Sequence, residues 1–173
     1  MKLQLDSSRK EVVQSVEMIS EDEMNLKPTD TTWSISQVLE HLYKTEKEIT
    51  KAIHYTLTLP EQEPLPDKPI ALTLDRTFKI KAKNSIVPSE KKMNKQQLLT
   101  DLESSRKELF ILIDSLPNDI DLTTRGFIHP AFKTLSLKQW IEFIGYHEKR
   151  HLEQIHEIKD AVRKRNTSAQ SKS

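Results

Sequence analysis

The chain has 173 residues and a formal net charge of +1, with 27 Lys and Arg against 26 Asp and Glu. This length suits one ordinary domain, and the balanced charge gives no indication of a nucleic-acid partner or a membrane surface. No cysteine is present, which excludes disulfides, thiolate metal ligands and a cysteine nucleophile. Only two glycines occur, which argues against a β-rich fold, because tight turns and hairpins usually need glycine.

Hydropathy along the chain indicates where the protein works. No apolar run approaches the ~20 residues that a membrane span needs. The N-terminal segment MKLQLDSSRK lacks the apolar core of a secretory signal. We therefore expect a cytoplasmic protein that does not bind membranes.

Four segments carry apolar residues at helical spacing. The first runs from about Asp6 to Met24 and ends before Pro28, since the residue before a proline is disfavoured in a helix. The second begins at Ser34, which forms an S-x-x-Q capping box with Gln37. This second stripe fades before Pro60.

A long connection separates the second and third helices. Residues 60–69 hold four prolines and are expected to form a loop. Residues 71–93 can form either a short helix or an extended cover. The third helix begins near Asn94, and Pro117 lies just beyond its end, where a stop signal is expected.

Residues 118–134 form a second long connection, and the fourth helix begins at Ser136, again with an S-x-x-Q pattern. The end of the chain is basic and then serine-rich, so we expect a disordered tail over residues 166–173. Four amphipathic helices with two long connections predict an all-α fold. We expect one four-helix bundle domain over residues 1–165, with long crossover connections.

Two histidines of the last helix face the same way as its apolar residues. A helix advances ~100° per residue, so His151 lies ~20° and His147 ~60° from a buried centre placed at Ile144. Two imidazoles one turn apart on one face can bind the same metal ion. Catalytic zinc sites usually have three protein ligands, and facing helices of a bundle supply them, so His41 of the second helix is the natural third ligand.

The histidines also have a simpler explanation. A single inward histidine is more often a hydrogen-bonded core residue than a ligand, so a core network without metal stays open as an interpretation. His54 and His156 lie off the apolar stripes and are expected to be solvated. His129, before Pro130, either lines the mouth of the site or caps a turn, and we favour the turn.

Residues 147–151 have the sequence H-E-K-R-H, which matches the H-E-x-x-H pattern of zinc metallopeptidases with Glu148 as general base. The extended peptidase pattern needs glycine and a third histidine downstream, where this chain has Gln154 and Glu157. A peptidase is therefore a minor interpretation. Glu148 still lies ~40° from the buried centre of its helix, so it is our candidate catalytic acid or base.

Two motifs resemble those of the DinB/YfiT-like superfamily. One combines His-Pro, a helical Trp and H-x-x-x-H-x-x-Q-I, and the other is W-S-x-x-x-x-x-x-H-L. The matching residues are His129, Pro130, Trp140, His147, His151, Gln154 and Ile155 for the first motif, and Trp33, Ser34, His41 and Leu42 for the second. The resemblance implies a four-helix bundle whose His41, His147 and His151 bind one divalent transition metal, nickel or zinc.

The resemblance also implies an activity. Several members of this family are thiol S-transferases that use low-molecular-weight thiols such as bacillithiol or mycothiol, others are proposed hydrolases, and homodimers are common. This implies a metal-dependent enzyme whose ion activates water or an external thiol towards a small-molecule substrate. The alternative is a noncatalytic metal-binding stress-response module. Family members often carry glycine where this chain has Lys133, a cation that could narrow the entrance or contact an anionic substrate.

Overall fold

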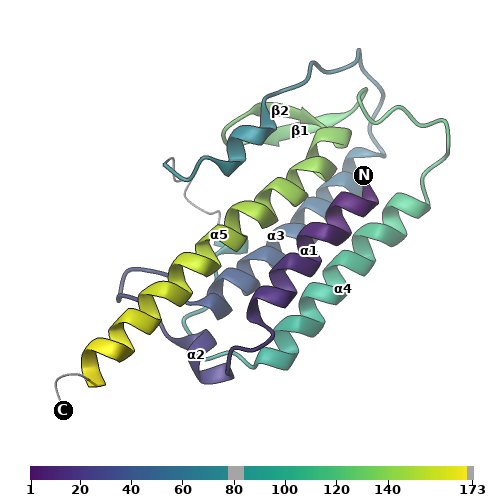
Figure 1. Cartoon of the computed structure of the whole chain (residues 1–173). Helices are drawn as coiled ribbons and strands as arrows, with labels where there is room; N and C mark the ends of the chain where they lie inside the picture. Colours follow the sequence, from purple (N-terminus) through teal and green to yellow (C-terminus); the bar gives the residue numbers. More distant parts are fainter. Residues whose placement is uncertain (78–83, 171–173) are drawn as a thin grey trace.

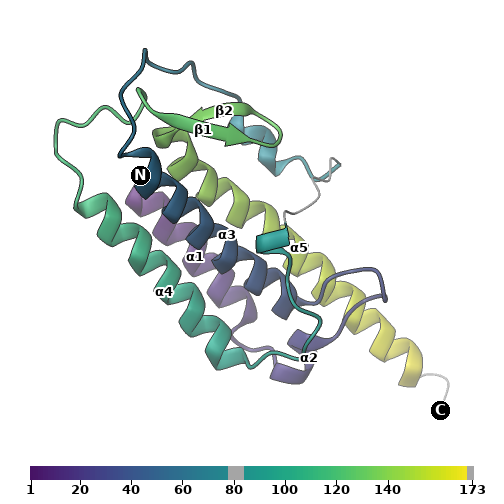
Figure 2. The same ribbon diagram turned by 180° about the vertical axis from the view of Figure 1, so that it is seen from behind.

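The computed structural model describes residues 1–77 and 84–170, with residues 166–170 as backbone only. Four long helices form a bundle, which confirms the predicted fold class (Figures 1 and 2). These helices are α1 (Lys2–Val16), α3 (Ile35–Thr56), α4 (Lys95–Asp114) and α5 (Leu137–Gln170). The smaller elements are α2 (Glu21–Asn25), the 3-10 turns η1 (Ile70–Leu74) and η2 (Asn84–Ile86), and the strands β1 (Gly126–His129) and β2 (Lys133–Ser136).

The helices do not alternate up and down. In Figures 1 and 2, α1 and α5 run in one direction while α3 and α4 run in the other. Helices α3 and α4 are parallel neighbours, so the segment that joins them in the sequence, after Thr56 and before Lys95, is a crossover connection from one end of the bundle to the other. On this path η1 packs against α5 and η2 packs against α3. The crossover connection therefore contacts the two helices that carry the predicted metal ligands.

Apolar stripes from all four long helices meet in the interior. Val12, Leu39, Leu102 and Ile155, one from each helix, are each 0% exposed. Complete burial of one such side chain contributes about 1.5–3 kcal/mol to folding. This packing fixes which side of α3 and of α5 faces the neighbouring helix.

The first helix is shorter than predicted. We expected a helix over about Asp6–Met24, but α1 ends at Val16 and a separate helix, α2, follows. Ser20 starts α2, because its hydroxyl accepts from the Glu23 N–H while the Glu23 carboxylate accepts from the Ser20 N–H. The capping box at Ser20 therefore begins a new helix in place of a continuation of α1. By contrast, the predicted capping box at Ser34 and the predicted start of the third helix near Asn94 are confirmed.

We expected a second long connection over residues 118–134, and its later part, continuing to Ser136, forms a β-hairpin. Strand β1 pairs antiparallel with β2, and His129 lies opposite Lys133 across the turn. Lys133 adopts a φ of 61°, a left-handed conformation that favours glycine. A Cβ on Gly126 would lie 2.2 Å from the Leu135 carbonyl oxygen, so this glycine allows the two strands to approach. The scarcity of glycine therefore did not prevent a hairpin, because glycine is present at the position of closest strand approach, Gly126.

Two other expectations concern the crossover and the chain end. The crossover contains the short turns η1 and η2, and the part of it that includes Phe78 and Ile80 lies outside the described residues. The tail expected to be disordered from residue 166 is helical as far as Gln170. Extending a long helix needs no new nucleus, so weak helix formers can follow it. Residues 171–173 lie outside the described part.

Within the described part of the chain, no helix is both long enough and apolar enough to cross a bilayer.

Replacing Lys133 by glycine is expected to raise the free energy of unfolding by about 1 kcal/mol, because glycine adopts this backbone conformation without steric cost. Chemical denaturation of the two proteins measures the difference. Thr134→Gly, one residue further along β2, is the matched control and should lower stability, since glycine weakens a strand. A Lys133→Gly protein no more stable than the parent would show that the turn is unstrained.

Candidate metal centre

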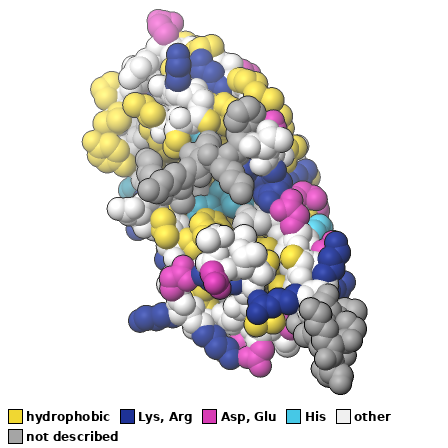
Figure 3. Space-filling view, turned by 90° about the vertical axis from the view of Figure 1, so that its left-hand side faces the viewer, with side chains coloured by type: hydrophobic (Ala, Val, Ile, Leu, Met, Phe, Trp, Pro, Cys, Tyr) yellow, Lys and Arg dark blue, Asp and Glu magenta, His cyan; other side chains and the backbone are white. Residues whose placement is uncertain are grey.

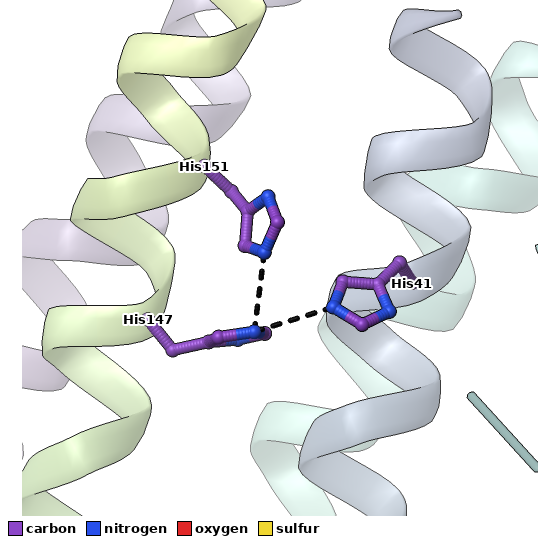
Figure 4. Close-up of side chains that lie close together, drawn as sticks. All are labelled: His41, His147 and His151. Carbon is purple, nitrogen blue, oxygen red and sulfur yellow. Dashed lines mark hydrogen bonds between the residues drawn. The ribbon is translucent and has the colours of Figure 1, made fainter. Parts of the chain in front are cut away.

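The structure brings together the three histidines singled out in the sequence. His41 projects from α3, and His147 and His151 project from α5 (Figure 4). The His147 Nε2 atom lies 3.2 Å from His41 Nε2 and 3.1 Å from His151 Nε2. One ligand atom from each residue lies within 4.8 Å of the others, so the group can hold a metal ion.

Helix geometry explains this convergence. His147 and His151 are one turn apart on α5, so both rings lie on the same face. Helix α3 packs directly against α5, which brings His41 across from that pair. His41 and His151 are buried and His147 is partly exposed. Figure 3 shows histidine side chains, in cyan, at the surface near the middle of this face of the molecule.

The outer nitrogens of two rings already have partners. His41 Nδ1 lies 2.9 Å from the carbonyl oxygen of Ile86, in η2. His151 Nδ1 lies 2.8 Å from the side-chain oxygen Oε1 of Gln154. Both partners are acceptors, so each Nδ1 carries the proton and donates it. In a neutral ring this leaves Nε2 of His41 and of His151 with a bare lone pair.

The inner nitrogens cannot all be satisfied by protons. A proton on His147 Nε2 can form one full hydrogen bond, but both other Nε2 lone pairs face this atom. At least one buried acceptor is therefore left without a full donor, which is costly in the interior. A cation shared by the three lone pairs removes this deficit.

The distances also suit a metal ion. Two nitrogen ligands at ~2.0–2.1 Å from a tetrahedral ion are themselves ~3.3 Å apart. The observed Nε2 separations of 3.2 and 3.1 Å are close to that value. Acceptors that bind the outer ring nitrogens are a regular feature of histidine metal sites, because they fix the tautomer and the ring orientation. The residues present therefore fit a metal ion.

Burial keeps the imidazoles neutral, which is the form that binds metals. Burial lowers the pKa of His41 and lowers that of His147 well below the ordinary value. For His151, burial followed by the charge of a protonated His41 lowers the pKa to about 3. Positive charge on Arg150 further lowers the pKa values of His147 and His151. The three imidazoles therefore stay neutral over the physiological pH range.

Aromatic rings surround the histidines. Trp33 lies with its ring centroid 5.1 Å from that of His41 and stacks on His151 at 6.5 Å. Phe143 stacks on His147 at 5.5 Å. These rings limit the hydration of the imidazoles, which accounts for the burial that lowers their pKa values.

His129 lies in the hairpin turn, as we favoured from the sequence. Its Nδ1 accepts from the backbone N–H groups of Ala131 and Phe132, at 3.0 and 3.3 Å. Its ring packs against Phe143, which separates it from His147. His129 thus packs behind Phe143 and is not one of the three converging histidines.

The remaining predicted residues lie elsewhere. His54 and His156 are exposed, as predicted. Lys133 is exposed in the hairpin turn. Glu148, our candidate acid or base, is 1% exposed, and its carboxylate accepts from the Ser8 hydroxyl and, at 2.5 Å, from Arg9 Nε. These contacts hold its carboxylate among groups of α1, whereas the three Nε2 atoms face one another between α3 and α5.

Three buried partners in the structure, the Ile86 carbonyl beside His41 and the arginines Arg9 and Arg106 beside Glu148, are not among the residues predicted from the sequence. The Ile86 carbonyl could not be found, because backbone acceptors leave no trace in residue type. Arg9 and Arg106 carried a usable signal, since each occupies a helical position among buried apolar residues such as Val12 and Leu109. A charge at such a position needs a buried partner.

A crossover four-helix bundle with three converging histidines defines the class of protein. The chain belongs to the DinB superfamily, whose model matches residues 4–155, and this confirms the family inferred from the motifs. It is 33% identical over 157 residues to the uncharacterized protein YuaE of Bacillus subtilis (strain 168), covering 91% of this chain and 96% of YuaE.

Two solved structures share the fold. One is TT2238, a four-helix bundle protein, with a TM-score of 0.60 and 17% identity over 88% of this chain and 93% of that chain. The other is YfiT from Bacillus subtilis, described as a probable metal-dependent hydrolase with an unusual four-helix bundle topology. It has a TM-score of 0.60 and 19% identity, covering 91% of this chain and 83% of that chain. At these identities the likeness shows the fold alone.

The stability of the metal-free protein should fall as the pH drops below about 6.5. In that range an unfolded histidine takes up a proton, whereas folded His151, with its pKa near 3, stays neutral. The unfolded state then binds more protons, so stability decreases towards pH 3. His151→Phe should reduce this loss, measured by denaturation between pH 7 and 4, by on the order of a few kcal/mol.

The matched control for this measurement is His156→Phe, because His156 is exposed on the same helix. It should show the pH dependence of the parent protein. Identical pH profiles for His151→Phe and the parent would contradict the assignment of a buried neutral imidazole.

Proposed function

We propose that this protein is a metal-dependent enzyme that binds one divalent transition metal ion through Nε2 of His41, His147 and His151. The observation that carries the proposal is the mutual approach of these three atoms, two of them with bare lone pairs fixed by Nδ1 donors. Nickel and zinc are the ions that the family resemblance implies, and imidazole suits both, as it also suits copper and iron.

Three protein ligands favour catalysis over a purely structural role. Structural zinc sites usually have four protein ligands, whereas catalytic sites have three and keep a position for water or substrate. Among the described residues, the group able to hold a metal comprises only the three histidines. Three neutral imidazoles leave the full charge of the ion to lower the pKa of a bound water or thiol and generate a nucleophile.

The chain's own residues would prepare this site. Ile86 and Gln154 hold the rings of His41 and His151 in the tautomer that points a lone pair inward. Trp33 and Phe143 cover the ring faces and restrict water. His147, the partly exposed member of the triad, marks the side from which a small molecule can approach.

We propose two reactions for the site: hydrolysis by an activated water, or transfer to an activated external thiol. The chain has no cysteine, so a thiol nucleophile must come from a separate low-molecular-weight compound. The description of YfiT as a probable metal-dependent hydrolase supports the first reaction. Glu148, held by Ser8 and Arg9, is retained as acid or base only if its carboxylate leaves those partners.

Metal content of protein purified without a nickel column provides the first test. We expect one divalent ion per chain, and we expect His151→Ala to lose it, because two imidazoles hold a metal far more weakly than three. His54→Ala is the control, since His54 is exposed and lies 13 residues after His41 on the same helix. Metal-free parent protein that cannot be reloaded with nickel or zinc would contradict the proposal.

Turnover by the loaded protein tests catalysis itself. Esters and amides probe hydrolysis, and thiols combined with epoxides or chloro-aromatics probe transfer. We expect metal-dependent turnover in one set, at least a hundredfold lower in His151→Ala. A stoichiometric ion without turnover in either set would favour the noncatalytic metal-binding module instead.

A further inference from the structure

We propose that a buried network of four charged residues sets the alignment of the two helices that carry the metal ligands. The members are Arg9 on α1, Glu46 on α3, Arg106 on α4 and Glu148 on α5. The inference rests on the proposed function, because it assigns these residues a positioning role for the histidine centre. None of them needs to touch the metal or the substrate.

Arg9 joins the two glutamates through separate nitrogens. Its Nε donates to Glu148 Oε1 at 2.5 Å, and its Nη2 donates to Glu46 Oε2 at 2.7 Å. Its remaining nitrogen, Nη1, donates to the Leu102 carbonyl of α4. One planar guanidinium therefore contacts α3, α4 and α5 from its place on α1.

Arg106 repeats this arrangement from the other side. Its Nε donates to Glu46 Oε1 at 2.6 Å, and its Nη1 donates to the Leu5 carbonyl of α1. Its Nη2 lies 2.9 Å from Glu148 Oε1 as an ion pair without hydrogen-bond geometry. Both glutamates are 1% exposed and both arginines 7% or less, so water screens these interactions little.

The position of the glutamates connects the network to the metal centre. Glu148 directly follows His147, and Glu46 lies five residues after His41 on the same helix. A rotation of α5 about its axis therefore moves Glu148 and the two histidine rings together. The same holds for Glu46 and His41 on α3.

A metal centre tolerates little rotation of this kind. Ligand distances must hold within ~0.2 Å. An atom ~6 Å from a helix axis moves that far when the helix turns by only ~2°. Apolar packing is non-directional, whereas a guanidinium fork fixes both distance and direction to a carboxylate. The directional network can supply an alignment that packing leaves loose.

Stability alone does not explain four buried charges. Removing ions from water is costly, and replacing a buried ion network by apolar residues of similar size often leaves a protein as stable or more so. A role in fixing geometry accounts for a network that joins both ligand-bearing helices through two others. Burial opposes ionisation of Glu46, but Arg9 and Arg106 outweigh it and lower the pKa of this carboxyl.

The decisive variant replaces the whole network: Arg9→Met, Glu46→Leu, Arg106→Met and Glu148→Leu. The hydroxyls of Ser8 and Ser105 also bond to backbone carbonyls, so neither is left without a partner. We expect cooperative unfolding at least as stable as the parent, one zinc ion still bound, and zinc affinity at least tenfold lower by competition with a chelating dye. Parent-like affinity would overturn the proposal.

Leu109→Ala is the matched control, because Leu109 is fully buried on α4 but belongs to no ion pair. It should lower stability and leave the zinc affinity of the folded protein within about twofold, against the tenfold expected for an outer group that positions a ligand. Equal losses of affinity in Leu109→Ala and in the fourfold variant would show that affinity merely follows stability, and would also overturn the proposal.

A milder variant decides the matter if the fourfold replacement does not fold. Arg9→Lys keeps the charge but removes the planar guanidinium whose Nε and Nη2 donate to both glutamates. Its zinc affinity should fall at least threefold, and an unchanged affinity would overturn the positioning role. Zinc binding by the parent protein separates the two proposals, because a parent that binds none overturns the proposed function and this inference together.

Discussion

The structure depends on one electrostatic constraint: three imidazole nitrogens meet in an interior that has too few protons to share among them. His41 and His151 donate their Nδ1–H groups to the Ile86 carbonyl and the Gln154 side chain, so the Nε2 atoms of both rings are acceptors. Both acceptors face a third ring that can donate only once. An apolar environment makes that deficit costly and at the same time disfavours protonation. A divalent cation would satisfy all three nitrogens, and this is the physical argument for the proposed metal centre.

The connectivity of the bundle brings a crossover segment to the proposed metal centre. Because α3 and α4 are parallel, a crossover joins them, and its described turns η1 and η2 pack against α5 and α3. The Ile86 carbonyl that orients His41 comes from this crossover. A simple up-and-down bundle would join α3 to α4 by a short loop and would have no such segment here. On the other side of the same helix pair, the Arg9–Glu46–Arg106–Glu148 network occupies the bundle interior.

Much of this could be predicted from the sequence, and the reasons are local. Ser34 and Gln37 marked the start of α3, and the position of His147 and His151 on one helical face predicted that both rings point towards α3. The break after Val16 was not predicted, because the capping box at Ser20 competes with a longer apolar pattern. The hairpin was not predicted, because its turn has Lys133 rather than glycine at the left-handed position. The Ile86 acceptor was beyond reach, since a backbone oxygen is placed by the fold as a whole. The two buried arginines were within reach, because a charge on an apolar stripe requires a partner.

X-ray absorption at the metal edge of zinc-loaded protein tests the central claim most directly, because it counts the nitrogen ligands and measures their distances. We predict three imidazole nitrogens at about 2.0–2.1 Å, with one imidazole fewer in the His41→Ala protein. A spectrum of the parent dominated by oxygen ligands, or one unchanged by loss of His41, would show that the ion binds elsewhere and that the three rings form only a hydrogen-bonded cluster.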